Sequence, residues 1–258
     1  MSPSIYPVKC LKRRKGKSKP HLIQCSDGHR YLVKLKNNPQ GTRSLVNEYV
    51  VSKLGLLLGL PIPPASYIQI SQSFIQSNPL FEKYDFVPGN QFASLYIDGC
   101  TALSKEEPFP VRDQIQNHAI IPGIFLFDIW VSNQDRWKNN ILLQPVKEGK
   151  FYLYLIDHGD CFPEGREWTI KSLKKSPNLR KFRSVHQWCL EQIKSSQELY
   201  PFLDRIEHLP LDHIQMVVHS IPHDWDVSTK EKNALVQHLI SGKQKLPALV
   251  HEYTTKFI

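Results

Sequence analysis

At 258 residues and 29.9 kDa, the chain is long enough to bury a sizeable core in one large domain or in two lobes. Its 41% hydrophobic and 22% charged residues form an ordinary globular mixture, which argues against wholesale disorder. The net charge of +9 favours an acidic partner such as a nucleotide, a nucleic acid or an acidic protein.

The sequence also argues against several other classes of protein. The longest apolar runs, near Leu54 and Ile120, are interrupted before they reach the roughly 18 residues of a membrane span. No apolar segment follows the basic residues near the N-terminus, so we expect no secretory signal and a cytoplasmic location. The five cysteines form no CxxC pair, which argues against a disulfide framework or a zinc knuckle. No nucleic-acid-binding motif is visible, although the chain is basic.

The first predicted elements form a β-hairpin from His21 to Leu35. Two strand-like runs flank Ser26-Asp27-Gly28, and Asp-Gly is a strong signal for a tight turn. The second run ends on Lys34, where a long cationic side chain can reach into a cleft. A lysine at the end of a strand is also commonly an exposed surface residue.

A helix follows the hairpin. Leu45, Tyr49 and Leu57 belong to a series of apolar residues at helical spacing, and Gly59 with the nearby proline ends it. Strand-like segments follow at 65–70 and 80–87. The second runs into a Pro-Gly-Asn turn, where we place a lobe boundary after residue 88.

Beyond residue 88 the chain becomes mainly helical. Helices are predicted near 111–132, 184–200, 204–220 and 228–242, and a pair of strands within 141–156. The predicted fold class is therefore α+β, with a small β-rich N-lobe over residues 1–88 and a larger, mainly helical C-lobe over residues 89–258.

Two short motifs carry the candidate chemistry. NQDRWKNN places Asp135 and Asn140 at the spacing that separates the base from the metal-binding Asn in a kinase catalytic loop. Asp157, in IDHG, follows a predicted hairpin that would return it to Asn140, and a carboxylate beside an amide oxygen suits a hard cation. Glu48, on the predicted helix, is able to pair with Lys34. Each pattern alone also fits a turn or a helix cap.

The order of these motifs is more specific than any one of them. Strand-Lys34, helix-Glu48, LGLPIPPASYI, FLFDIWVSNQDR and LIDHG together resemble the HipA-like serine/threonine kinases of the protein-kinase-like superfamily. A secondary likeness is to the phosphatidylinositol 3-/4-kinases. The resemblance covers roughly residues 20–160, and the last hundred residues match by helical character only.

The resemblance implies a two-lobed protein-kinase-like fold that binds ATP and Mg²⁺. Lys34 would bind ATP phosphate, Glu48 would orient Lys34, and Asp135 would take or position the proton of the acceptor hydroxyl. Asn140 and Asp157 would hold magnesium.

The resemblance also implies roles for two segments of the N-lobe. Ser26 and Gly28 would lie over the phosphates. The segment 81–87, with Tyr84 and Phe86, would link the lobes and read adenine through its backbone.

Three residues depart from the family pattern. The turn before His29 has one glycine where protein kinases use a glycine-rich loop. Trp137 stands where these families usually carry His, and an indole cannot shuttle a proton. His158 replaces the Phe of DFG. These departures are compatible with a pseudokinase.

The expected function is ATP- and magnesium-dependent phosphoryl transfer to a protein Ser/Thr hydroxyl. The basic clusters at 12–19 and 171–183 are either solvated surface or contacts for an acidic partner. Two alternatives stay open. One is a kinase of a small molecule, such as a sugar, a lipid headgroup or an antibiotic. The other is a nucleotide-binding pseudokinase that acts as a regulatory binding module.

Overall fold

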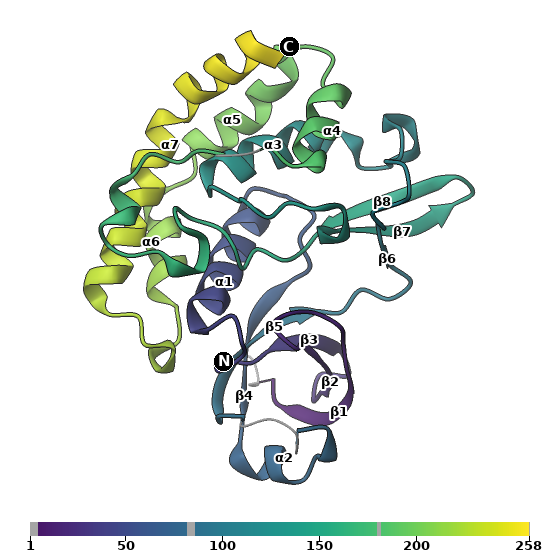
Figure 1. Cartoon of the computed structure of the whole chain (residues 1–258), viewed down its shortest axis with the longest axis vertical. Helices are drawn as coiled ribbons and strands as arrows, with labels where there is room; N and C mark the ends of the chain where they lie inside the picture. The colour runs from purple at the N-terminus through teal and green to yellow at the C-terminus, as the bar shows by residue number, and fades with distance from the viewer. Residues whose placement is uncertain (1–4, 82–85, 180–181, 258) are drawn as a thin grey trace.

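The computed structural model describes residues 5–81, 86–179 and 182–257. A lobe built on a five-stranded sheet lies at one end of the molecule, and most helices gather at the other end (Figure 1). The elements of the first lobe are β1 (Pro7–Arg13), β2 (His21–Cys25), β3 (Arg30–Lys34), α1 (Thr42–Leu57), β4 (Ala65–Ile70), α2 (Gln72–Gln76) and β5 (Gly89–Leu95). The strand order is β1-β2-β3-β5-β4, with all neighbours antiparallel.

The predicted hairpin, the helix and the strand at 65–70 are confirmed as β2–β3, α1 and β4. Strand β2 pairs with β3 with His21 opposite Val33, and Gly28 in their turn has φ 80°, a conformation that favours glycine. Strand β1 is not predicted from the sequence, because its basic, mostly exposed residues hide the alternation expected of a strand.

The segment after β4 differs from its prediction. The strand expected at 80–87 is not present in the described part of the chain, where α2 and a 3₁₀ turn at Pro79–Phe81 follow β4. Residues 82–85, including Tyr84, lie outside the described residues. Strand β5 then hydrogen-bonds with both β3 and β4, so the first sheet continues past the boundary that we placed after residue 88.

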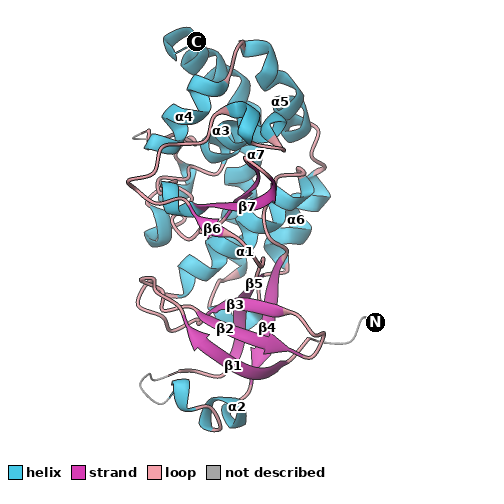
Figure 2. Ribbon diagram, turned by 90° about the vertical axis from the view of Figure 1, so that its right-hand side faces the viewer, coloured by secondary structure: helices cyan, strands magenta, loops and turns pink. Residues whose placement is uncertain are grey.

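The larger lobe combines a small sheet with helices. Its elements are β6 (Thr101–Ala102), α3 (Ile121–Trp130), β7 (Ile141–Lys147), β8 (Lys150–Leu155), α4 (Ser184–Gln192), α5 (Tyr200–Glu207), α6 (Leu211–His219) and α7 (Thr229–Phe257). Strands β6 and β7 lie between the helices and the first sheet (Figure 2). Helix α3 is buried at every position, which matches its nearly unbroken apolar sequence.

Helix α1 packs mainly with the larger lobe. Its buried face, including Leu45 and Val50, belongs to the same hydrophobic core as Ile124 of α3, whereas the outer face of the first sheet has a separate core around Ile23 and Phe81. Side-chain hydrogen bonds add to this packing. Asn47 donates to the carbonyls of Gly159 and Cys161 at 2.9 and 3.0 Å. The helix therefore holds the two lobes together.

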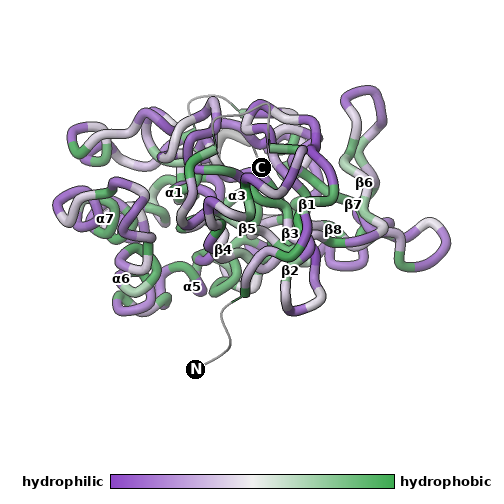
Figure 3. The backbone as a smooth tube through the Cα atoms, turned by 90° about the horizontal axis from the view of Figure 1, so that it is seen from below, coloured by the Kyte–Doolittle hydropathy of each residue, from purple (hydrophilic) through white to green (hydrophobic). Residues whose placement is uncertain are grey.

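The hydropathy of the backbone follows this architecture. Hydrophobic segments run through the interior, and several outlying loops are hydrophilic (Figure 3). Among the described residues, no helix has both the length and the apolar character needed to cross a membrane.

Candidate active site

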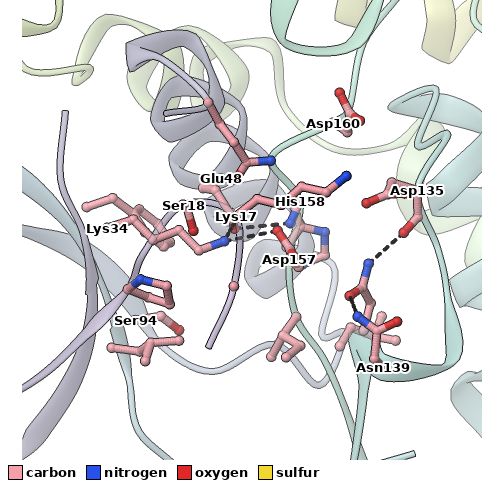
Figure 4. Close-up of a pocket in the computed structure, with 18 of the residues that line it drawn as sticks. Lys17, Ser18, Lys34, Glu48, Ser94, Asp135, Asn139, Asp157, His158 and Asp160 are labelled. Carbon is pink, nitrogen blue, oxygen red and sulfur yellow. Dashed lines mark hydrogen bonds and ion pairs between the residues drawn. The ribbon is translucent and has the colours of Figure 1, made fainter. Parts of the chain in front are cut away.

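A cavity of about 540 Å³ is lined by residues of both lobes. Five of the residues predicted from sequence line it together: Lys34, Glu48, Asp135, Asn140 and Asp157. Lys34 and Glu48 come from β3 and α1, and the other three come from the loops that flank β7 and β8. Lys34 extends toward Asp157, and Asp135 faces them across the cavity beside Asn139 (Figure 4). The structure thus brings these five side chains into one place, while their chemical roles stay predictions.

Lys34, Glu48 and Asp157 form an ionic cluster, which we call the cavity cluster. The ammonium of Lys34 pairs with Glu48 Oε1 and lies 2.9 Å from Asp157 Oδ1. The second oxygen of Glu48 accepts the backbone N–H of His158 at 3.1 Å. Strand β3, helix α1 and the segment after β8 are therefore joined through a single carboxylate and a single ammonium.

The cavity cluster holds two carboxylates and one ammonium, so it carries excess negative charge. Burial opposes the charged form of Lys34, but Asp157 and Glu48 outweigh it and raise the pKa of Lys34. The ammonium of Lys34 in turn lowers the pKa of Asp157. Burial raises the pKa of Glu48 to about 7. The Asp157 side chain is 43% exposed and that of Glu48 only 3%, so Asp157 is the carboxylate of this cluster that a ligand in the cavity can reach.

The catalytic-loop motif forms a tight, internally bonded turn. The backbone N–H of Asp135 donates to Asn133 Oδ1 at 3.0 Å, and Asn140 Nδ2 donates to the Asp135 carbonyl at 2.5 Å. The indole of Trp137 donates to Asp135 Oδ1 at 2.5 Å. Burial raises the pKa of Asp135, the Trp137 bond opposes this effect, and the charge of Asp157 adds to it. The loop sequence therefore aims one carboxylate at the cavity.

A second ionic cluster, which we call the core cluster, lies behind this loop and consists of Asp128, Arg136 and His186. Arg136 binds both oxygens of Asp128 at 2.9 Å through Nε and Nη2, and His186 Nε2 lies 3.1 Å from Asp128 Oδ2. Arg136 Nη1 also donates to the carbonyl of Ile156, next to Asp157, at 3.0 Å. All three side chains are fully buried. The core cluster supports both loops at the cavity. The sequence feature that could have pointed to this cluster is Asp128, an aspartate inside the apolar helix segment FLFDIW.

The loop between β1 and β2 lines the cavity, and the turn between β2 and β3 does not. Lys15, Gly16, Lys17 and Ser18 line the cavity, whereas Ser26 and Gly28 do not. Their turn is closed internally instead, because Asp27 accepts the N–H of His29 and the hydroxyl of Tyr31 at 3.0 and 2.7 Å. Ser26 and Gly28 are thus not among the residues that line the cavity, and their role at the phosphates stays a prediction. The basic run KRRKGKSK, for which solvated surface and contact with an acidic partner were both open, supplies lysines to the cavity instead.

The segment 81–87, predicted as the inter-lobe linker, is only partly described by the structure. Phe86 packs in the first lobe, with its ring centroid 4.8 Å from that of Phe81 and 5.2 Å from that of His21, and it does not line the cavity. Tyr84 lies among the residues that the structure does not describe. The chain passes to the larger lobe after β5, between residues 95 and 101. Apolar side chains from both lobes line part of the cavity, including Leu32, Phe92 and Leu155.

The donor atoms at the cavity suit a hard divalent cation. In the described residues, no group of three or more His, Cys, Asp or Glu side chains gathers in a way that could hold a metal ion. Asp157 has a lowered pKa and supplies an ionised carboxylate, and Asn140 supplies an amide oxygen at the same cavity. Mg²⁺ in nucleotide sites uses one or two carboxylates together with phosphate oxygens and water. These residues therefore fit Mg²⁺ better than a transition metal.

Comparisons with solved structures show a protein-kinase-like fold. The Helicobacter pylori proinflammatory kinase CtkA matches with a TM-score of 0.61 and 14% identity, over 99% of this chain and 100% of that one. The Golgi casein kinase matches with a TM-score of 0.53 and 11% identity, over 96% of this chain and 72% of that one. A second structure of that kinase, with Mn/ADP bound, has a TM-score of 0.51, an identity of 11%, and coverage of 94% and 72%.

Sequence comparisons identify the family within this fold. A segment of 59 residues, 23% of the chain, is 42% identical to phosphatidylinositol 4-kinase gamma 2 of Arabidopsis thaliana and spans only 10% of that protein. A family model described as HipA-like kinase matches residues 9–252. That match covers nearly the whole chain, and the protein therefore belongs to the HipA-like kinase family.

Proposed function

We propose that this kinase-family protein transfers the γ-phosphoryl group of ATP, with Mg²⁺, to a Ser/Thr hydroxyl of a protein. The observation that carries the proposal is the cavity cluster, because Lys34 bridges the helix carboxylate of Glu48 and the cavity carboxylate of Asp157. Phosphoryl transfer needs this kind of cation near the nucleotide phosphates and this kind of carboxylate at the metal. Asp135 and Asn140 line the same cavity.

The roles follow from the placement of each group. Lys34 and the β1–β2 loop, with Lys15 and Lys17, bind the phosphates through positive charge. Asp157 and Asn140 would hold Mg²⁺, which neutralises charge on the phosphate oxygens when bound. The apolar part of the cavity suits the adenine ring.

Asp135 is the group placed for the acceptor. The acceptor oxygen bonds to the γ-phosphorus as the bond to the β–γ bridging oxygen breaks, and ADP leaves with that electron pair. The proton of the hydroxyl passes to Asp135. The raised pKa of Asp135, due to burial and to the nearby charge of Asp157, makes its carboxylate a better proton acceptor than an ordinary exposed aspartate.

The comparisons bear on the nature of the acceptor. Membership of the HipA-like kinase family and the similarity in fold to CtkA and to the Golgi casein kinase favour a protein acceptor. The short match to phosphatidylinositol 4-kinase gamma 2 favours a second candidate, a small alcohol such as a lipid headgroup. A pseudokinase is disfavoured, because such a module has no chemical need for all four of Lys34, Asp135, Asn140 and Asp157 at one cavity.

The decisive experiment compares Asp135→Asn with the wild type in transfer of label from γ-labelled ATP. With Mg²⁺ present, we expect label on a protein of the lysate or on the chain itself, and a fall of roughly 10²–10⁴-fold in the Asp135→Asn rate. Nucleotide affinity should stay unchanged, because Asp135 serves the acceptor. Asp212→Asn, at an exposed aspartate of α6, is the matched control.

The outcomes separate the candidates. Label on a small molecule alone would replace the protein acceptor with the second candidate. Full transfer by Asp135→Asn, or ATP binding without any transfer by the wild type, would contradict the proposed mechanism.

A further inference from the structure

Trp137 is bonded to the carboxylate that the proposed reaction uses. Its indole N–H donates to Asp135 Oδ1 at 2.5 Å, and its backbone N–H donates to the Asp135 carbonyl at 2.9 Å. Trp137 is exposed, with a relative accessibility of 39%, and it lines the cavity. Among the described residues, the Trp137 indole is the side-chain donor that bonds to the Asp135 carboxyl, and this bond orients the group.

The Trp137 ring also contacts Arg183. The guanidinium of Arg183 lies 4.3 Å from the centroid of the Trp137 ring, a cation–π contact. Arg183 Nε donates to the carbonyl of Gln134 at 2.7 Å, and its backbone N–H donates to His186 Nδ1 at 3.1 Å. His186 belongs to the core cluster. A continuous set of contacts therefore runs from the buried core, through Arg183, to the exposed ring beside Asp135.

The chemistry of the indole limits what this arrangement can do. An indole nitrogen is a hydrogen-bond donor only, so Trp137 cannot take the proton from Asp135 or pass it on. The terminal torsion of an aspartate is broad, and a carboxylate without a partner samples many orientations. A donor fixed on Oδ1 selects one orientation and leaves Oδ2 to face the cavity.

We propose that Trp137 is a positioning residue that fixes Oδ1 of Asp135 so that Oδ2 meets the acceptor hydroxyl. The catalytic part of this inference rests on the proposed function. A neutral imidazole at this position could donate the same bond. The positioning is therefore provided by an N–H donor and not by a proton relay.

The test removes the indole N–H donor of residue 137 and keeps an aromatic ring at that position. In Trp137→Phe the stack on Arg183 is retained but the N–H is lost, so we expect kcat to fall about 10- to 100-fold while KM for ATP stays unchanged. Trp137→His should restore most of kcat. Trp188→Phe is the control, because it removes the indole N–H that bonds to the Pro110 carbonyl in the helical lobe. We expect it to leave kcat unchanged.

A second measurement does not depend on activity. The indole ¹H–¹⁵N resonance of Trp137, assigned by its loss in Trp137→Phe, should move in Asp135→Ala while the other four tryptophans stay in place. A stationary resonance, or an unchanged kcat in Trp137→Phe, would overturn the inference and leave the proposed function intact. Absence of transfer by the wild type would instead remove the proposed function, and the resonance would still decide whether Trp137 binds Asp135.

Discussion

The two ionic clusters of this protein are built from similar residues but differ in their access to solvent. The cavity cluster has one cation for two carboxylates and opens at Asp157, which is 43% exposed. In the core cluster the guanidinium of Arg136 binds both oxygens of Asp128, and all side chains are fully buried. The first cluster has unbalanced charge beside a cavity, and the second has its main charges paired and sealed.

The comparison shows where a buried charge can serve chemistry. Excess negative charge next to an opening attracts a cation, and a metal or a nucleotide can complete it. The buried Asp128–Arg136 pair is fully hydrogen-bonded and has no free acceptor for a ligand, so it serves to hold two loops in place. Residues of the core cluster therefore belong to the support of the site and not to its chemistry.

The largest expected effect on stability comes from removing the cation of the core cluster. Arg136→Met leaves Asp128 buried without its cation, and we expect the free energy of unfolding to fall by about 3–5 kcal/mol. Chemical denaturation with two independent probes measures this loss. The double variant Asp128→Leu/Arg136→Met removes both charges and should recover much of the stability. A loss of less than about 1 kcal/mol in the single variant would contradict the structural role.

A smaller loss of stability is expected from the cavity cluster. In Lys34→Met the carboxyl of Glu48, whose pKa is already raised to about 7 by burial, can take up a proton and become neutral. We therefore expect a loss of only about 1–2 kcal/mol in the same denaturation assay, together with loss of measurable ATP binding. Equal destabilisation by Lys34→Met and Arg136→Met would remove the distinction between the clusters.

The smallest expected effect is on the pH dependence of the free energy of unfolding, which should differ between the two clusters. The folded-state pKa of Glu48 is raised from 4.5 to about 7, chiefly by burial. Stability of the wild type relative to Glu48→Gln should therefore be highest below about pH 4.5, fall as the pH rises toward about 7, and level off above it.

The core cluster should respond with the opposite sign and in another range. Burial would raise the pKa of Asp128, but Arg136 and His186 outweigh burial and lower it below the ordinary 3.8. Its contribution is therefore fully present above about pH 3.8 and lost only as the pH falls further. Between pH 5 and 8 the difference between wild type and Asp128→Asn should stay flat, and unfolding free energies across that range check both curves. A slope there would show that a group of the core cluster titrates in this range and would contradict the expected flat difference.

Much of this protein can be predicted from the sequence, because the relevant signals are local. The hairpin β2–β3, helix α1 and strand β4 follow from turn residues and apolar periodicity within short windows. The spacing of Asp135 and Asn140 is a property of one loop. The motif order was enough to predict the two-lobed fold and the family, which the comparisons confirm.

The remaining features depend on contacts between distant segments, which no short window records. Strand β1 carries mostly exposed basic residues, and only its pairing with β2 brings Lys15 and Lys17 to the cavity. Strand β5 belongs to the first sheet because it pairs with both β3 and β4. The bond from Lys34 to Asp157 crosses 123 positions of the chain. Such contacts are selected by burial and by the pairing of charges in the folded chain, so only the tertiary structure decides them.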